Sequence, residues 1–178
     1  IAPRLEDDGE VTVDMGEPIF DLPKVPFDPT GLQSLDIGDD KSWTLLVNGH
    51  ARQLSILSMG NPHAVMQVDD VETADVLSLG PEVEVLENFP SKVNVGFMQV
   101  LSPAAIRLRV FERNAGETLA CGTGACAAVV AGIRLGLLSN KVDVAMRGGA
   151  VTIEWAGVGH PVLMTGPTET VFEGEIEL

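Results

Sequence analysis

The feature that most constrains the fold is the run Cys-Gly-Thr-Gly-Ala-Cys-Ala-Ala-Val-Val-Ala-Gly, which extends from Cys121 to Gly132. Its small and apolar residues predict a tightly packed helix over about Thr123–Leu135 that is apolar on nearly all sides. A helix of this kind is buried all round, so other elements have to surround it. We therefore predict an α+β fold in which a mixed or antiparallel sheet wraps around one central helix.

The thiol of Cys121 stands directly before this predicted helix. The first N–H groups of a helix have no partner within it, and they lie at the positive end of the helix dipole. Such a position lowers the pKa of a cysteine and also binds carboxylates. We therefore predict that Cys121 is catalytic rather than a small buried hydrophobe, whereas Cys126, more than a turn inside the apolar helix, is structural.

Two other glycine-rich motifs are excluded here. A phosphate-binding loop ends in Gly-Lys-Ser/Thr, and no lysine stands near Cys121. A dinucleotide-binding fingerprint needs a third glycine where this chain has Ala127.

Alternation of apolar and polar residues predicts four half-buried strands, at 11–15, 106–110, 142–146 and 151–155. Gly148-Gly149 separates the last two strands and is typical of a hairpin turn. Four prolines predict an extended connector over residues 17–29, and an acidic surface loop is expected at 31–42. Helical spacing at 70–86, broken at Gly80-Pro81, predicts two short helices.

The composition limits the partners and the location of the chain. Its 178 residues carry a net charge of -15 with only 11 Lys and Arg, which disfavours nucleic-acid binding. No apolar stretch is long enough to cross a membrane and no signal peptide opens the sequence, so we expect a cytoplasmic protein without a membrane partner.

The cysteine and histidine spacing predicts neither a disulfide nor a metal site. Cys121 and Cys126 on one helix would lie about 7.5 Å apart along its axis, outside the usual disulfide span. Neither a Cys-x-x-Cys motif nor paired histidines at metal-ligand spacing occurs.

Polar residues interrupt apolar runs at three further places. Gly60-Asn-Pro-His-Ala separates two apolar segments, Asn94 stands inside a predicted strand, and Glu112-Arg113 follows another. Asparagine is disfavoured in strands unless it bonds something, and a guanidinium suits bidentate capture of a carboxylate. Arg113 also stands out with Arg107 and Arg109 because the chain has few cations.

These segments together resemble the diaminopimelate epimerases. The matching motifs are GNPHAV at 60–65, VNVGF at 93–97, ERNAGET at 112–118 and ACGTGACA at 120–127, in the order of the family. The similarity extends over the whole chain, from VTVDMGEP at 11–18 to FEGE at 172–175. The resemblance implies an enzyme that interconverts LL- and meso-diaminopimelate, for lysine and cell-wall synthesis, without pyridoxal phosphate or a metal.

The family uses two cysteines on opposite faces of the substrate α-carbon, one as thiolate base and the other as thiol acid. The resemblance makes Cys121 the second of these cysteines, with the N–H groups of Gly122 and Thr123 holding the reacting carboxylate. It implies that Asn61, Asn94 and Arg113 grip the distal amino-acid end of the substrate. It also implies that Glu112 and His63 tune the proton affinity of the thiols and of the substrate ammonium.

The sequence departs from the family in two ways. Asn114 replaces the usual glycine, and we expect the turn to survive because asparagine tolerates the left-handed region. The other catalytic cysteine belongs to an N-terminal half that is absent here, and the chain opens on Ile1 rather than Met.

The chain is thus expected to be the C-terminal part of the enzyme, inactive when isolated, with the missing half as partner and a homodimer possible. Residues 1–21 and 168–178 are assigned to strands that belong with the missing domain, and 22–167 to the C-terminal domain. Two alternatives stay open. One is another isomerase of the same fold, similar to proline racemase or to the phenazine-biosynthesis isomerase, and the other is a non-catalytic half that binds a zwitterion.

Overall fold

A computed structural model describes residues 3–169 and 174–176 of the chain. Within these residues the elements in chain order are β1 (Arg4–Leu5), β2 (Val11–Asp14), the one-turn helix η1 (Leu22–Lys24), β3 (Gln33–Ile37), β4 (Asp40–Val47), β5 (His50–Ser58), β6 (Pro62–Gln67), α1 (Val76–Glu84), β7 (Asn94–Ser102), β8 (Ala105–Glu112), β9 (Gly116–Thr118), α2 (Gly122–Arg134), β10 (Lys141–Met146), β11 (Gly149–Trp155) and β12 (Val162–Gly166).

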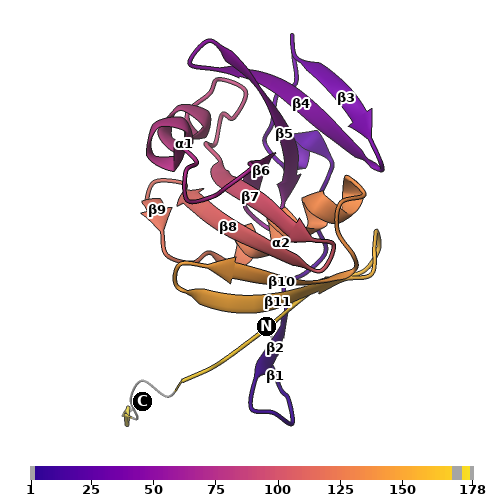
Figure 1. Cartoon of the computed structure of the whole chain (residues 1–178), viewed down its shortest axis with the longest axis vertical. Helices are drawn as coiled ribbons and strands as arrows, with labels where there is room; N and C mark the ends of the chain where they lie inside the picture. The colour runs from indigo at the N-terminus through magenta and orange to yellow at the C-terminus, as the bar shows by residue number, and fades with distance from the viewer. Residues whose placement is uncertain (1–2, 170–173, 177–178) are drawn as a thin grey trace.

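The strands form one strongly curved mixed sheet (Figure 1). Its order is β1-β2-β12-β11-β10-β8-β7-β6-β5-β4-β3, and β9 pairs with β8 off this path. Among the described strands, β6 with β7 and β8 with β10 are the parallel pairs, and the other neighbours are antiparallel. The predicted α+β fold is confirmed.

The helix α2 occupies the inside of this curve. All its residues from Gly124 to Gly132 are buried, and the helix contacts β5, β6, β7, β8, β11 and β12. Side chains from both arms of the sheet, such as Leu57, Leu108 and Ile153, complete this core. The predicted helix over Thr123–Leu135 therefore exists, one residue earlier at each end.

A second apolar core covers the opposite face of the central strands. On β5, Leu54 and Ile56 face this second core whereas Leu57 faces α2. The helix α1 and the proline-rich segment, through Val25 and Phe27, close the second core. The central strands are therefore buried on both faces, which explains why β5 and β6 read as continuous apolar runs rather than as alternating patterns.

The prediction of a surface loop at 31–42 is wrong, because β3 and the start of β4 occupy this stretch and pair with each other. Every residue of β3 is exposed, and its two apolar side chains, Leu35 and Ile37, give too short an alternation to predict a strand. The turn between the two strands is held from outside, by a hydrogen bond from the Asp39 N–H to the Arg134 carbonyl and by an Asp40–Arg134 ion pair.

The prediction of two short helices at 70–86 is also wrong. A single helix, α1, runs through both Gly80 and Pro81. Gly80 serves close packing rather than a break, because a Cβ added there would lie 2.5 Å from Cγ of Phe111 on β8. Tertiary packing of α1 onto the sheet thus overrides the local preference of a Gly-Pro pair to end a helix.

The four strands predicted from alternation are confirmed as β2, β8, β10 and β11. The hairpin turn consists of Arg147 and Gly148, because Gly149 already pairs with Met146. The extended connector at 17–29 is interrupted by the single turn η1.

The β1–β2 hairpin projects from the body of the molecule and joins the sheet through β12 (Figure 1). Residues 170–173 and 177–178 of the predicted terminal strand lie outside the described residues, and the domain limits stay a prediction. None of the helices in the described part of the chain has the length and apolarity needed to span a membrane.

We expect Gly80→Ala to lower the free energy of unfolding by about 1–3 kcal/mol, because the added methyl group has to displace the Phe111 ring or the helix. Gly96→Ala is the matched control, since its Cβ would lie 3.6 Å from Val65 in ordinary contact. Urea denaturation of both variants measures the difference. Equal stabilities would show that α1 does not need the close approach at Gly80.

Candidate active site

The sheet topology brings the predicted polar segments to one edge. Because β6 and β7 are parallel, their first residues lie side by side, with His63 opposite Asn94. Because β8 is antiparallel to β7, its last residues reach the same edge, with Phe111 opposite Val95. The N-terminus of α2, capped by Cys121, belongs to the same region, since Thr123 contacts Asn61 just before β6.

Four of the predicted residues form a continuous hydrogen-bonded row. His63 Nε2 lies 3.1 Å from Asn61 Oδ1, and Asn61 Nδ2 donates to Thr123 Oγ1 at 3.3 Å. Thr123 Oγ1 in turn lies 3.7 Å from Cys121 Sγ. The row therefore runs from the buried ring of His63 to the sulfur at the helix N-terminus.

The donors and acceptors along this row follow from which atoms carry a proton. The Asn61 amide nitrogen donates to Thr123, so the amide oxygen is the atom that faces His63 and the ring presents an Nε2–H. Because Thr123 Oγ1 already accepts a hydrogen bond, its own proton is free to point at the sulfur. Either the hydroxyl or the thiol can donate across this contact, and when the sulfur is a thiolate the hydroxyl donates to it, which lowers the pKa of Cys121.

The surroundings oppose the expected low pKa of Cys121. The thiol is 6% exposed, and burial, the largest effect, raises its pKa, as does the nearby Glu112 carboxylate. The hydrogen bonds with Thr123 and with the Gly124 N–H act in the opposite direction. In the described chain the expectation of a lowered pKa is therefore wrong, and Cys121 rests as a thiol.

His63 is neutral at physiological pH. Burial, assisted by the charge of Arg113, lowers its pKa to about 3. Its ring is 1% exposed on β6, so the neutral form keeps a fixed position and a fixed partner in Asn61.

Asn94 and Arg113 form a second group at the same edge. Asn94 is buried, donates to the Pro62 carbonyl at 3.0 Å and accepts from the Arg113 N–H at 2.9 Å. The Arg113 guanidinium donates to the Ser91 carbonyl at 2.8 Å, which leaves most of its donors for a ligand. Asn94 therefore ties β6, β7 and the end of β8 together, and this bonding accounts for an amide inside a strand.

The β8–β9 hairpin carries Glu112 and leads into Cys121. The Thr118 hydroxyl donates to Glu112 Oε1 at 2.5 Å across this hairpin. Asn114 sits at its turn with φ +62°, so the turn survives the replacement of glycine, as predicted.

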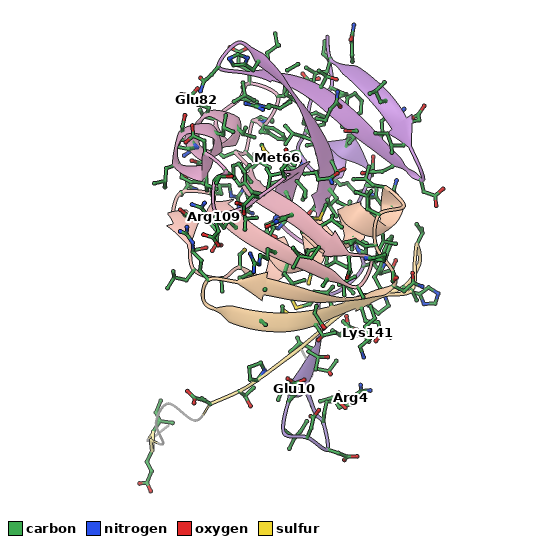
Figure 2. All side chains as sticks on the ribbon, in the orientation of Figure 1. Arg4, Glu10, Met66, Glu82, Arg109 and Lys141 are labelled. Carbon is green, nitrogen blue, oxygen red and sulfur yellow. The ribbon has the colours of Figure 1, made fainter. Side chains whose placement is uncertain are left out.

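A buried ion pair anchors the same hairpin. Arg109, on the central strand β8 near β9 (Figure 2), donates to both carboxylate oxygens of Glu117 at 2.6 and 3.0 Å and to the Val71 carbonyl. Arg147 adds a second cation to Glu117, at 2.9 Å. The Arg109 guanidinium, chiefly by its hydrogen bonds, lowers the pKa of Glu117. The Arg109 guanidinium is thus engaged by the fold through several bonds, whereas that of Arg113 has one such bond among the described residues, to Ser91.

Close packing shapes the helix N-terminus. A Cβ on Gly122 would lie 3.2 Å from Sδ of Met164 on β12, and one on Gly124 would lie 3.0 Å from Val110. Both glycines therefore let the sheet approach the first turn of α2. With no side chains at these two positions, the backbone N–H groups are the polar groups that the turn presents there. Cys126 is a free, fully buried thiol whose pKa burial raises to about 12, in keeping with a structural role.

Comparison with known proteins assigns this arrangement to a family. The family model described as diaminopimelate epimerase matches residues 55–171, which hold every predicted site residue. The chain belongs to the diaminopimelate epimerase family. It is 59% identical over 182 residues to the diaminopimelate epimerase of Variovorax paradoxus (strain S110), covering 100% of this chain and 62% of that protein. It is 58% identical to the enzyme of Ralstonia pickettii (strain 12J), covering 98% of this chain and 60% of that protein.

The chain thus spans about three fifths of the length of the curated relatives it matches. Among solved structures, it is similar to a hydroxyproline epimerase from Agrobacterium vitis, with a TM-score of 0.59, 15% identity and coverage of 93% of this chain and 52% of that one. A probable proline racemase from Agrobacterium radiobacter K84 gives a TM-score of 0.58, 15% identity and coverage of 99% and 56%. At this identity the two structures establish the shared fold.

Sequence reasoning missed three residues that shape the site: Thr118, Met164 and Glu84. Thr118 belongs to the ERNAGET motif, so the sequence could have pointed to this residue, but not to its hydrogen bond with Glu112. Met164 and Glu84 come from distant elements, and only the folded chain brings them to the site. In the described part of the chain, no cluster of three or more His, Cys, Asp or Glu side chains could hold a metal.

We expect iodoacetamide to alkylate Cys121 slowly at pH 7 and faster with rising pH, because only the thiolate reacts and burial raises its pKa. Thr123→Val removes a hydrogen bond that lowers this pKa, so alkylation at a given pH should slow about threefold or more. Mass spectrometry of the native chain measures both rates, with Cys126 as the internal unreactive control. A rate that is flat between pH 7 and 9 would contradict the raised pKa.

We also expect His63 to destabilise the fold in acid. Its pKa falls from 6.5 when unfolded to about 3 when folded, so between these values the unfolded chain binds the extra proton and stability drops as pH drops. The loss should approach about 1.4 kcal/mol per pH unit. Urea denaturation between pH 6.5 and 4 checks this against His63→Gln, which does not titrate. Parallel pH profiles of the two proteins would refute it.

Proposed function

We propose that the protein containing this chain interconverts LL- and meso-diaminopimelate by transferring a proton at one α-carbon. The observation that carries the proposal is a thiol at the N-terminus of a buried helix, in contact with the Thr123 hydroxyl, in a member of the diaminopimelate epimerase family. The long double zwitterion requires one site for the reacting end and another for the distal end, and the described residues offer both.

At the reacting end, the N–H groups of Gly122 and Thr123 hold the substrate carboxylate and stabilise the negative charge that builds as the α-proton leaves. Cys121 rests as a thiol, so in one direction it donates its proton to the α-carbon while a second cysteine, as thiolate, removes the original proton from the opposite face. In the reverse direction the Cys121 thiolate takes the proton. The Thr123 hydroxyl stabilises this thiolate in both cases.

Two further residues, the neutral His63 and the carboxylate of Glu112, influence the Cys121 thiol in different ways. His63 keeps the Asn61 amide in the orientation that leaves the Thr123 proton for the sulfur. Glu112, held by Thr118, places a carboxylate near the thiol, where it raises the pKa of Cys121 and attracts the substrate ammonium.

At the distal end, the free donors of Arg113 bind the second carboxylate, with Asn61 and Asn94 beside it. Asn94 and Asn61 keep unused amide donors after their bonds within the protein. The second cysteine comes from the N-terminal part by which the relatives are longer, so the chain alone is expected to be inactive. We place residues 1–21 and 168–178 with that part, and residues 22–167 in the C-terminal domain. Catalysis without pyridoxal phosphate or metal, a cytoplasmic location and a homodimer remain part of the same proposal.

A proline-racemase-like reaction is the second candidate, because the chain shares the fold of a structure named as a probable proline racemase and of one named as a hydroxyproline epimerase. Proline has no distal amino-acid end, so the unengaged donors of Arg113 favour diaminopimelate. A half that only binds a zwitterion describes the isolated chain rather than the whole protein.

The decisive experiment incubates the whole gene product with LL-diaminopimelate in D₂O. We expect deuterium at the α-carbon and formation of the meso isomer, and we expect both rates to fall at least 10³-fold in Cys121→Ala because the acid–base group is lost. Cys126→Ala, a buried cysteine on the same helix, is the matched control and should keep its activity. Wild-type protein that exchanges proline but not diaminopimelate would favour the second candidate.

A further inference from the structure

Three residues near the distal end of the site contradict their local preferences. Glu84 is the last residue of α1, where a negative charge is unfavourable, and it is only 7% exposed. Lys92 and Asn114 lie in the left-handed region with φ +58° and +62°, which is uncommon for residues other than glycine. Such departures need compensation from tertiary contacts.

The three residues compensate one another. Glu84 Oε1 accepts from the Asn114 backbone N–H at 2.8 Å and from Lys92 Nζ at 3.3 Å. Lys92 Nζ also donates to Asn114 Oδ1 at 2.6 Å. The Lys92 cation neutralises the buried carboxylate, and the carboxylate in turn holds the backbone N–H of Asn114, whereas the Lys92 N–H donates to the Phe89 carbonyl at 2.8 Å. We call this group, Glu84, Lys92 and Asn114, the turn clip.

The turn clip joins the two loops that hold Arg113. Arg113 directly precedes Asn114, and its guanidinium donates to the carbonyl of Ser91, which directly precedes Lys92. Its backbone N–H is held by Asn94. With Asn114 fixed by Glu84, the Arg113 backbone is held at its own N–H and at that of the next residue. The direction of its side chain is then set by the loop at Ser91.

We propose that Glu84 is a positioning residue that orients Arg113 toward the distal carboxylate of the substrate. This inference rests on the proposed function for the carboxylate that Arg113 binds, whereas the contacts between Glu84, Asn114 and the loop at Ser91 do not depend on it. Glu84 belongs to α1, away from the helix N-terminus that carries Cys121, and its hydrogen bonds go to Asn114, in the turn that follows Arg113, and to Lys92. Its loss should therefore weaken substrate binding and leave the proton transfer intact.

The kinetic test uses the whole gene product with LL-diaminopimelate. Glu84→Ala should raise KM about tenfold or more and change kcat less than threefold. Glu84→Gln keeps an acceptor oxygen for the Asn114 N–H, so its KM should stay within about threefold of wild type. Glu82→Ala, an exposed acid on the same helix (Figure 2), is the matched control and should change neither constant. A fall in kcat as large as the rise in KM, or an unchanged KM in Glu84→Ala, would overturn the proposal.

A second measurement separates this inference from the proposed reaction. The Arg113 Nε–H signal in ¹⁵N NMR relaxation reports how ordered the side chain is, with or without activity. We expect an ordered signal in wild type and in Glu82→Ala, and an averaged signal in Glu84→Ala although the rest of the spectrum stays folded. An Arg113 that stays ordered in Glu84→Ala refutes positioning by Glu84. An inactive wild type with the expected NMR pattern refutes the reaction and keeps the positioning role.

Discussion

The burial of α2 is the constraint on which the rest of this structure depends. A helix with no charged side chain between Gly122 and Ile133 has to be shielded from water on every side, so the sheet curves until both of its arms contact it. Only its two ends can meet polar groups. The N-terminal end, with its unpaired N–H groups, is therefore the place where the fold offers a polar site beside an apolar core.

The polar residues at that end are stable only because they satisfy one another. Within the described residues, every buried side-chain nitrogen and oxygen has a hydrogen-bond partner. His63, Asn61 and Thr123 achieve this in a single row that ends at Cys121. The same row that satisfies the buried ring of His63 therefore places a hydroxyl, which can donate or accept, beside the Cys121 sulfur. The hydrogen bonds that satisfy the buried His63 side chain thus belong to the same row that reaches Cys121.

The parts of the fold that the sequence predicts are those set by short-range pattern. The central helix, the strands β2, β8, β10 and β11 and the motif at Cys121 each carry their signal in adjacent residues. The exposed edge strand β3 offers only Leu35 and Ile37 as an alternating pair, and α1 runs through its Gly-Pro pair because Phe111 packs against Gly80. The thiol of Cys121 shows the same limit, because the helix end is visible in sequence but burial, which raises its pKa, depends on the whole fold.

The two ends of the site are built in different ways, and this difference has a functional consequence. The reacting end stands on the first turn of a helix locked in the core, so its geometry changes only if the core changes. The distal end stands on a hairpin turn whose left-handed residue depends on a carboxylate from α1. In the proposed reaction, a change in the turn clip would therefore alter the choice of substrate without disturbing the helix terminus assigned to proton transfer. Substrate range would be separable from chemistry because different elements hold Arg113 and Cys121.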